Sequence, residues 1–187
     1  MKKLRCMLAA CLVLVSCLSA RAEGFSVSTN ILGYAWLGTM NAEASYAFAR
    51  RWTVTGYVAF NPWTFNASDA DRQFQSRQQT YAAGARFWPW HVYSGWWIAG
   101  KLQYQEYNMG GIISRSTEEG DRAGVGLAAG YTHMLHPRLN IEFGAGFWTG
   151  VKWFTEYSCP ACGLTRTSGN RAFILPDNFR ISISYVF

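Results

Sequence analysis

The sequence lacks long apolar runs, helical periodicity and any recognisable cofactor motif. Beyond residue 22, no apolar run approaches the ~18 residues that a membrane-spanning helix needs. Apolar residues rarely recur at the spacing of a helix face. Charged residues make up only 15% of the 187 residues, whereas 17% are aromatic. A single domain that is neither a helical bundle nor a helical membrane protein is therefore predicted.

The first 22 residues are predicted to be a secretory signal peptide rather than part of the fold. An apolar run extends from Met7 to Leu18, and the small-x-small sequence "ARA" occupies Ala20 to Ala22. Cleavage after Ala22 leaves one domain from Glu23 to Phe187. The basic head before the apolar run consists of Lys2, Lys3 and Arg5.

Processing as a lipoprotein at Cys17 is an alternative, because "LVSC" resembles a lipobox.

Loss of the leader removes four basic residues, so Lys+Arg falls from 17 to 13 against 11 acidic residues and the net charge becomes +2. A basic patch for nucleic acid therefore has no support. Of five cysteines only Cys159 and Cys162 remain, and an exported chain meets an oxidising compartment in which a disulfide persists.

Hydrophobicity alternates with a period of two along most of the mature chain, which indicates β-strands. In the last segment, for example, Phe179, Ile181 and Ile183 alternate with Arg180 and Ser182. Eight strands are predicted, at Phe25 to Leu32, Thr39 to Phe48, Trp52 to Asn61, Gln79 to Trp88, Trp96 to Glu106, Ala123 to Thr132, Leu139 to Trp148 and Asn178 to Phe187.

The connections between these strands alternate between short and long. Residues 62–78, 107–122 and 149–177 are predicted to be long loops, whereas most other connections are short turns. Alternating segments of about ten residues with this asymmetry are typical of outer-membrane barrels, with short turns in the periplasm. The predicted fold is all-β, an eight-stranded antiparallel up-and-down transmembrane β-barrel with both termini in the periplasm.

The composition of the two strand faces predicts which face meets lipid. The polar faces hold mainly Gly, Ser, Thr, Asn and small Ala, whereas soluble surfaces are about 25–35% charged. A basic residue on the lipid face costs about 2–4 kcal/mol near the midplane, so the charges are expected inside. Eight strands leave room only for side chains, and a filled interior is predicted. An ion-pair network inside it is predicted among Glu43, Arg86, Lys101, Glu142 and Arg180.

The nine tryptophans are predicted to form two aromatic girdles at the membrane interfaces, although ordinary core positions are an alternative. The periplasmic girdle would consist of Trp52, Trp88, Trp90, Trp96 and Trp97. The outer girdle would consist of Trp36, Trp63, Trp148 and Trp153.

Four short motifs, in this order along the mature chain, resemble an uncharacterised family of small outer-membrane barrels from Gram-negative anaerobes of the Bacteroides type. They are "STNIL" at residues 28–32, "NPWTF" at 61–65, "YNMGGI" at 107–112 and "CPACG" at 159–163. The chain also resembles small barrels of the OmpA/OmpX type. Such barrels end in an aromatic residue that the barrel-assembly machinery reads, and the resemblance implies this role for Tyr185 and Phe187.

"CPAC" is the most chemically suggestive motif, and three interpretations of it stay open. A disulfide between Cys159 and Cys162 that stiffens a surface loop is favoured over a redox site, because no βαβ pattern surrounds the motif. A zinc site would need two further ligands, and no other C-x-x-C or nearby histidine supplies them.

Catalysis has weaker support. The three histidines, His91, His133 and His136, fall in predicted periplasmic turns, away from the outer leaflet. Glu43 and Glu142 are two acids on the inner face, but structural pairing with cations is favoured over glycosidase chemistry. No catalytic residue, metal ligand or cofactor is assigned.

The sequence therefore predicts a monomeric barrel in the outer membrane of a Gram-negative bacterium. Its partners would be outer-membrane lipid, the barrel-assembly machinery and an unidentified extracellular protein or glycan. A structural or surface-interaction role through the outer loops is favoured. The alternatives are a lipid-modifying barrel enzyme and a lipocalin-like ligand-binding barrel or lipoprotein.

Overall fold

A computed structural model describes residues 24–66, 68, 72–112, 116–158 and 166–187, with the side chain of Asn178 left out of the description. The predicted leader and both mature cysteines lie outside these residues. Among them, no helix is long and apolar enough to cross a membrane. The strands are β1 (Phe25–Asn30), β2 (Met40–Ala49), β3 (Trp52–Asn61), β4 (Thr64–Phe65), β5 (Phe74–Phe87), β6 (Gly95–Gly110), β7 (Thr117–His136), β8 (Leu139–Tyr157) and β9 (Arg166–Val186), and one helix, α2, spans Ile31–Ala35.

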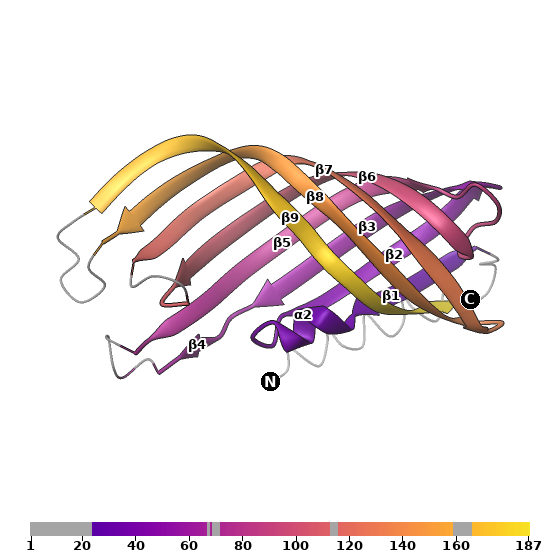
Figure 1. Ribbon diagram of the computed structural model, residues 1–187, viewed down its shortest axis with the longest axis horizontal. Coiled ribbons are helices and arrows are strands. Elements are labelled where there is room, and N and C mark those ends of the chain that lie inside the picture. Colours follow the sequence, from indigo (N-terminus) through magenta and orange to yellow (C-terminus); the bar gives the residue numbers. More distant parts are fainter. Residues whose placement is uncertain (1–23, 67, 69–71, 113–115, 159–165) are drawn as a thin grey trace, which may run out of the picture.

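The described strands form one antiparallel sheet of nine strands in the order β3-β2-β1-β9-β8-β7-β6-β5-β4. A further pairing of β3 with β5 closes the sheet into a ring, and the two-residue β4 extends one edge of β5 outside that ring. Eight strands thus form the ring, each hydrogen-bonded to its neighbours in the chain, and β1 pairs with β9 (Figure 1). The prediction of an all-β antiparallel sheet is confirmed.

The ring has two unlike ends. At one end, which we call the short-turn end, tight connections join β2 to β3 and β7 to β8. At the opposite end, which we call the long-strand end, β5 to β9 extend well beyond β1, β2 and β3 (Figure 1).

The long predicted loops are largely strand, which corrects the sequence-based boundaries. β7 begins at Thr117, β8 continues to Tyr157 and β9 begins at Arg166. Residues in these extensions are mostly polar on both faces, so they carry no apolar alternation. Backbone hydrogen bonds nevertheless continue the ladder from Gly124 to Thr117, because ladder pairing does not require apolar side chains.

The predicted first strand is also too long. β1 ends at Asn30, whose side chain accepts a hydrogen bond from the backbone N–H of Leu32 at 3.2 Å. This contact caps the short helix α2 and turns the chain out of the sheet. Residues 31 and 32 therefore belong to a helix.

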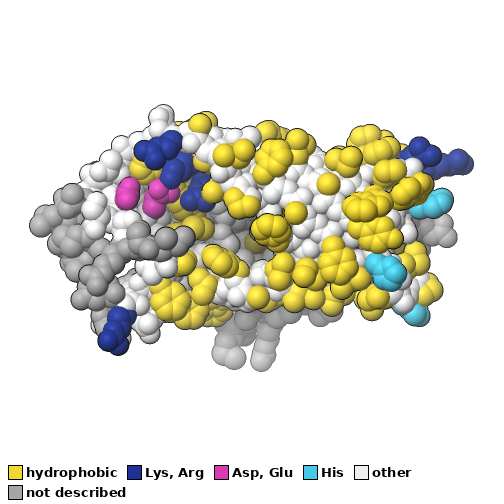
Figure 2. All heavy atoms as spheres, in the orientation of Figure 1, with side chains coloured by type: hydrophobic (Ala, Val, Ile, Leu, Met, Phe, Trp, Pro, Cys, Tyr) yellow, Lys and Arg dark blue, Asp and Glu magenta, His cyan; other side chains and the backbone are white. Residues whose placement is uncertain are grey.

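Burial is inverted relative to an ordinary globular domain. Among the described residues, 6 hydrophobic residues are buried and 21 polar or charged residues are buried. Apolar side chains alternate outward instead, as shown by Leu102 at 67% exposure between the inward-facing Lys101 and Gln103. Figure 2 shows these hydrophobic side chains spread over the middle of the visible face, with Lys, Arg, Asp and Glu gathered at the long-strand end and His with Lys or Arg at the short-turn end. The inner and outer faces thus lie as the strand composition predicts.

Three of the nine tryptophans do not lie on the outer face, which corrects the predicted girdles. Trp88, Trp97 and Trp148 are buried at 0%, 2% and 3% exposure. Trp97 lies one residue from the exposed Trp96, so the alternation of the strand points them in opposite directions. The remaining tryptophans are exposed, namely Trp36, Trp52, Trp63, Trp90, Trp96 and Trp153.

Candidate functional site

An ion-pair network crosses the interior of the ring, and we call it the charged plug. It consists of Glu43 on β2, Arg86 on β5, Glu142 on β8 and Arg180 on β9. Arg86 pairs with Glu43 and donates to Glu142 at 3.1 Å. The two terminal nitrogens of Arg180 donate to the two carboxylate oxygens of Glu43 at 2.8 and 2.7 Å. Two guanidinium groups thus balance two carboxylates, as buried charges require.

Lys101, the fifth residue of the predicted network, pairs with a different partner. Its ammonium group lies 2.8 Å from the carboxylate of Asp177. The sequence placed Asp177 in a loop, on the outward parity of the last strand. A bulge reverses that parity, because Gly144 pairs with Arg180 whereas Gly146 pairs with Asp177. The extra residue on β9 turns both Asp177 and Arg180 inward.

Buried aromatic rings fill the short-turn side of the plug. Trp88, Tyr93 and Trp97 form the buried hydrophobic cluster. The guanidinium of Arg86 lies 4.6 Å from the ring centroid of Trp97, which joins the charged plug to this aromatic layer. The indole N–H of Trp88 donates to the Thr53 hydroxyl at 3.1 Å. This half of the interior is filled, as predicted.

A second charged group, the outer cluster, lies on the inner face near the long-strand end. It consists of Tyr107, Glu118, Arg122 and Lys152. Glu118 accepts hydrogen bonds from Lys152 at 2.6 and 2.8 Å and from Tyr107 at 2.6 Å, and Arg122 lies 3.6 Å away. Burial raises the pKa of Glu118, but the hydrogen bonds from Lys152 and Tyr107 and the neighbouring cations hold it below its ordinary value.

A cavity of about 590 Å³ lies between the charged plug and the outer cluster. The interior is therefore not filled in this half, which corrects the prediction. The cavity reaches from Asp177 in the plug layer to Arg122 in the outer cluster. Its volume falls within the range of small-molecule sites. Another hollow, of about 770 Å³, opens at the long-strand end and is lined by Asn61, Gln78, Tyr107 and Phe154, among others.

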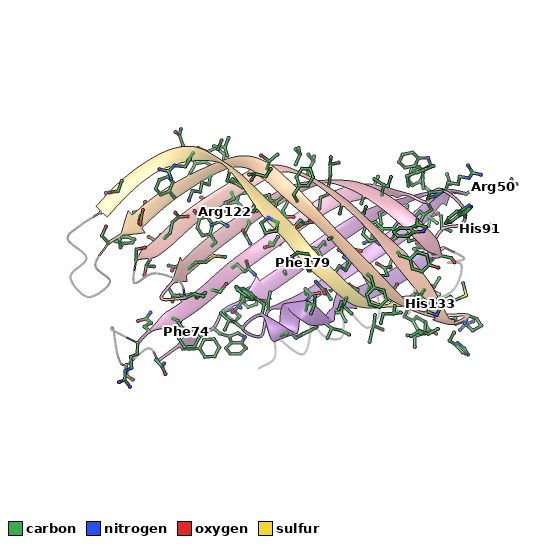
Figure 3. All side chains as sticks on the ribbon, viewed as in Figure 1. Arg50, Phe74, His91, Arg122, His133 and Phe179 are labelled. Atoms are coloured by element: carbon green, nitrogen blue, oxygen red, sulfur yellow. The ribbon has the colours of Figure 1, made fainter. Side chains whose placement is uncertain are left out.

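The remaining predicted residues lie apart from this cavity. His91 and His133 lie at the short-turn end (Figure 3), where His136 ends β7. No group of three or more potential metal-ligating residues exists among the described residues. The proposed pair Cys159 and Cys162 lies outside the described residues.

The predicted assembly residues close the ring at the short-turn end. Tyr185 on β9 pairs with Val27 of β1, and the backbone N–H of Phe187 donates to the carbonyl of Phe25 at 2.9 Å. The Tyr185 and Phe187 rings meet edge to face at 5.0 Å. Their role as a signal for the assembly machinery stays a prediction.

Sequence reasoning missed Asp177 and the whole outer cluster because it assigned their positions to loops. The alternation of Glu118, Gly120 and Arg122 was available as a signal, since residues two apart share one face of a strand. The bulge that turns Asp177 inward left no comparable pattern.

Comparison with known families decides the classification of the chain. A family model described as "Protein of unknown function (DUF3575)" matches residues 8–187. The chain belongs to this family. The DUF3575 match covers every strand of the ring, so the expectation of an uncharacterised family is confirmed. Neither a curated protein nor a solved structure matches the chain.

Proposed function

We propose that this DUF3575 protein is an eight-stranded β-barrel that spans the outer membrane of a Gram-negative bacterium. The observation that carries the proposal is the inverted burial, with apolar side chains outward and polar side chains inward. In water this arrangement exposes a continuous hydrophobic belt, whereas in a bilayer it matches lipid outside and keeps the ion pairs of the charged plug inside. A closed sheet also leaves no unpaired backbone around most of its circumference, as hydrocarbon requires.

The charged plug supports a role other than conduction. The charged plug cross-links four strands of the ring through Glu43, Glu142, Arg86 and Arg180. The aromatic layer that contains Trp88 lies next to it on the short-turn side. The small cavity beside the plug measures only about 30 Å³, far below the range of small-molecule sites. The barrel is accordingly a closed one that acts through its outer half, where five extended strands carry polar residues toward the cell exterior.

A soluble lipocalin-like barrel has less support, because such a barrel keeps an apolar face inside and a charged face in water. A lipid-modifying enzyme would need a nucleophile and a base together near the outer leaflet. His91 and His133 lie at the opposite, short-turn end instead (Figure 3), and His136 ends β7 there.

Fractionation tests the proposal directly. The full chain is expressed with its own leader in a Gram-negative host, and its outer membranes are washed with carbonate and run unheated in cold SDS gels. We expect the protein to stay with the membrane and to shift mobility on heating. Release by carbonate or high salt would contradict a membrane barrel.

Planar-bilayer recording of the purified protein tests the closed interior separately. We expect small or no current, because the plug blocks the ring. A large steady current would rule out the closed barrel while leaving the membrane location intact.

A further inference from the structure

We propose that the cavity between the charged plug and the outer cluster binds a single-chain anionic amphiphile, such as a fatty acid, which enters sideways from the membrane between α2 and β9. The head would lie at Arg122 and Gln103, and the chain would run past α2 toward lipid. This inference rests on the proposed function, since it requires lipid around the barrel.

The cavity wall has two chemically different sides. Its deep side is polar and is formed by inward-facing residues of β5, β6 and β7, namely Gln78, Thr80, Gln103, Gln105 and Arg122. Its shallow side is apolar and is formed by α2 and β9, with Leu32, Trp36, Leu175 and Phe179. A site with both kinds of wall fits a ligand with a polar head and a hydrocarbon chain.

The polar side presents groups without partners. Gln103 is only 7% exposed, and its side-chain oxygen makes no hydrogen bond to any described residue. The Nε of Arg122 is likewise buried and unpartnered within the described chain. Gln105, on the same strand, is satisfied by Gln78 at 2.6 Å and Thr80 at 3.0 Å. Leaving a buried polar group unpaired costs about 1–3 kcal/mol, so a head oxygen that accepts from Arg122 would relieve that cost at Arg122, whereas the Gln103 oxygen is itself an acceptor and does not pair with an anionic head.

The charge balance favours an anionic head. In the outer cluster one carboxylate, Glu118, faces two cations, Lys152 and Arg122. Asp177 on the cavity floor is already neutralised by Lys101 at 2.8 Å. Arg122 and Gln103 both line the cavity. A head oxygen can accept from a guanidinium N–H of Arg122 and, with the Gln103 amide turned so that its NH₂ faces the cavity, from Gln103 as well.

The ring is open to the side beside this cavity. β9 pairs with β8 from Arg166 onward, but its pairing with β1 begins only at Ser182, opposite Asn30. From Phe179 toward Arg166, that edge of β9 has no ladder partner among the described residues, and α2 lies beside it (Figure 1). A boundary without a hydrogen-bonded ladder separates more readily than one with a ladder, so this seam is the weakest part of the wall.

The seam is continuous with the lipid-facing belt. Phe179, on β9 beside the seam (Figure 3), is 66% exposed on the outer face and also lines the cavity. Trp36 at the other side of the seam is likewise exposed. The apolar belt therefore continues through Phe179 and Trp36 into the cavity wall, where a hydrocarbon chain can lie against both side chains.

Photo-crosslinking in lipid vesicles tests the proposal. The full mature protein is reconstituted in phosphatidylcholine and labelled with a palmitate analogue that carries a mid-chain diazirine, and the labelled residues are mapped by mass spectrometry. We expect labels on cavity residues such as Met109, Trp148 and Leu175. Palmitate should displace this label about tenfold better than hexadecanol, because only palmitate offers a charge-assisted hydrogen bond.

Matched variants separate the cavity from the belt. Ala59 is buried and lines the cavity, whereas Ala42 faces outward. Ala59→Trp should reduce cavity labelling about tenfold or more by occupying the space, and Ala42→Trp should leave it unchanged. Arg122→Gln should abolish the preference for palmitate over hexadecanol.

Three results would overturn the inference: labelling confined to belt residues such as Leu102, undiminished cavity labelling in Ala59→Trp, or equal displacement by palmitate and hexadecanol. Heat-modifiable mobility in cold SDS gels reports whether each variant folds. If Arg122→Gln does not fold, Gln103→Leu replaces it in the test of the preference for palmitate over hexadecanol. Carbonate extraction is independent of labelling, so a protein that stays in the membrane but shows no cavity label would refute the ligand and not the barrel.

Discussion

Glu43 is the residue on which the interior charge balance depends most. It accepts hydrogen bonds from both terminal nitrogens of Arg180 and also forms an ion pair with Arg86. Two buried cations therefore lose a partner if Glu43 is neutralised. Its alternating position on β2, between outward Ala42 and Ala44, was enough to predict an inward charge. The sequence placed Glu43 in a network with Arg86, Lys101 and Arg180, but it did not show that Arg86 and Arg180 rather than Lys101 would pair with it, because these cations lie on other strands.

Glu43→Gln should lower the free energy of unfolding by about 3–5 kcal/mol, because it leaves buried charge uncompensated. Urea unfolding in lipid vesicles, followed by tryptophan fluorescence, measures the change. Glu106→Gln is the control, since Glu106 is exposed and accepts only a 3.3 Å hydrogen bond from Tyr104; it should change stability by less than about 0.5 kcal/mol. Equal effects of the two variants would argue against a buried plug.

Glu118 should make stability depend on pH at the acidic end. Its folded pKa lies below its ordinary value of 4.5, so its contribution to stability is fully present above that value and is lost as the pH falls through the folded pKa. The difference in unfolding free energy between wild type and Glu118→Gln should therefore shrink on acidification below pH 4.5. A difference that grew in acid would contradict the pairing with Lys152 and Arg122.

At the scale of elements, close contacts between strands depend on glycines that face the interior. A Cβ on Gly144 of β8 would lie 2.9 Å from the Trp97 ring, and one on Gly130 of β7 would lie 2.4 Å from it. Trp97 on β6 can enter the interior only because both neighbouring positions lack a side chain. The sequence indicated that inward glycines make room, but not for which side chain.

Gly144→Ala should destabilise the protein by about 1–3 kcal/mol, because the added methyl group overpacks against a large buried ring. Gly56→Ala on β3 is the matched control, since a Cβ there meets no atom within 4 Å. Thermal unfolding of the two variants in the same detergent compares them. The proposed packing would be wrong if Gly144→Ala were the more stable of the two.

At the scale of the whole molecule, the two faces of the ring suit opposite solvents. On the face seen in Figure 2, the middle of the ring is apolar and the charged side chains lie toward its two ends. The charges of the plug, such as Arg86 and Glu142, lie inside the ring. The same property explains why the sequence has so little charge, because the outer positions are mostly apolar and buried charges in the interior need partners.

A charge placed on the middle of the outer face should therefore be costly in a bilayer. Leu102→Arg should destabilise the vesicle-embedded protein by about 2–4 kcal/mol, whereas Leu135→Arg, which lies outward near the short-turn end, should cost about 0–1 kcal/mol. Urea titration in vesicles measures both values. A soluble barrel would show neither the cost at Leu102 nor the difference between the sites.

The sequence alone determined the all-β class, the ring-forming strands with alternating hydrophobicity and the inward direction of the charges. These features follow from a period of two, which any single strand reveals without knowledge of its neighbours. The polar strand extensions escaped prediction because their pairing depends on backbone hydrogen bonds, which leave no apolar pattern.

Only the tertiary structure decided which groups meet. The bulge on β9, opposite Gly144 and Gly146, turned Asp177 toward Lys101. The early end of β1 at Asn30 left β9 without a ladder partner beside the cavity. Both are consequences of register between strands that lie far apart in sequence. A local pattern cannot report such contacts, because register is a property of pairs of strands rather than of either strand.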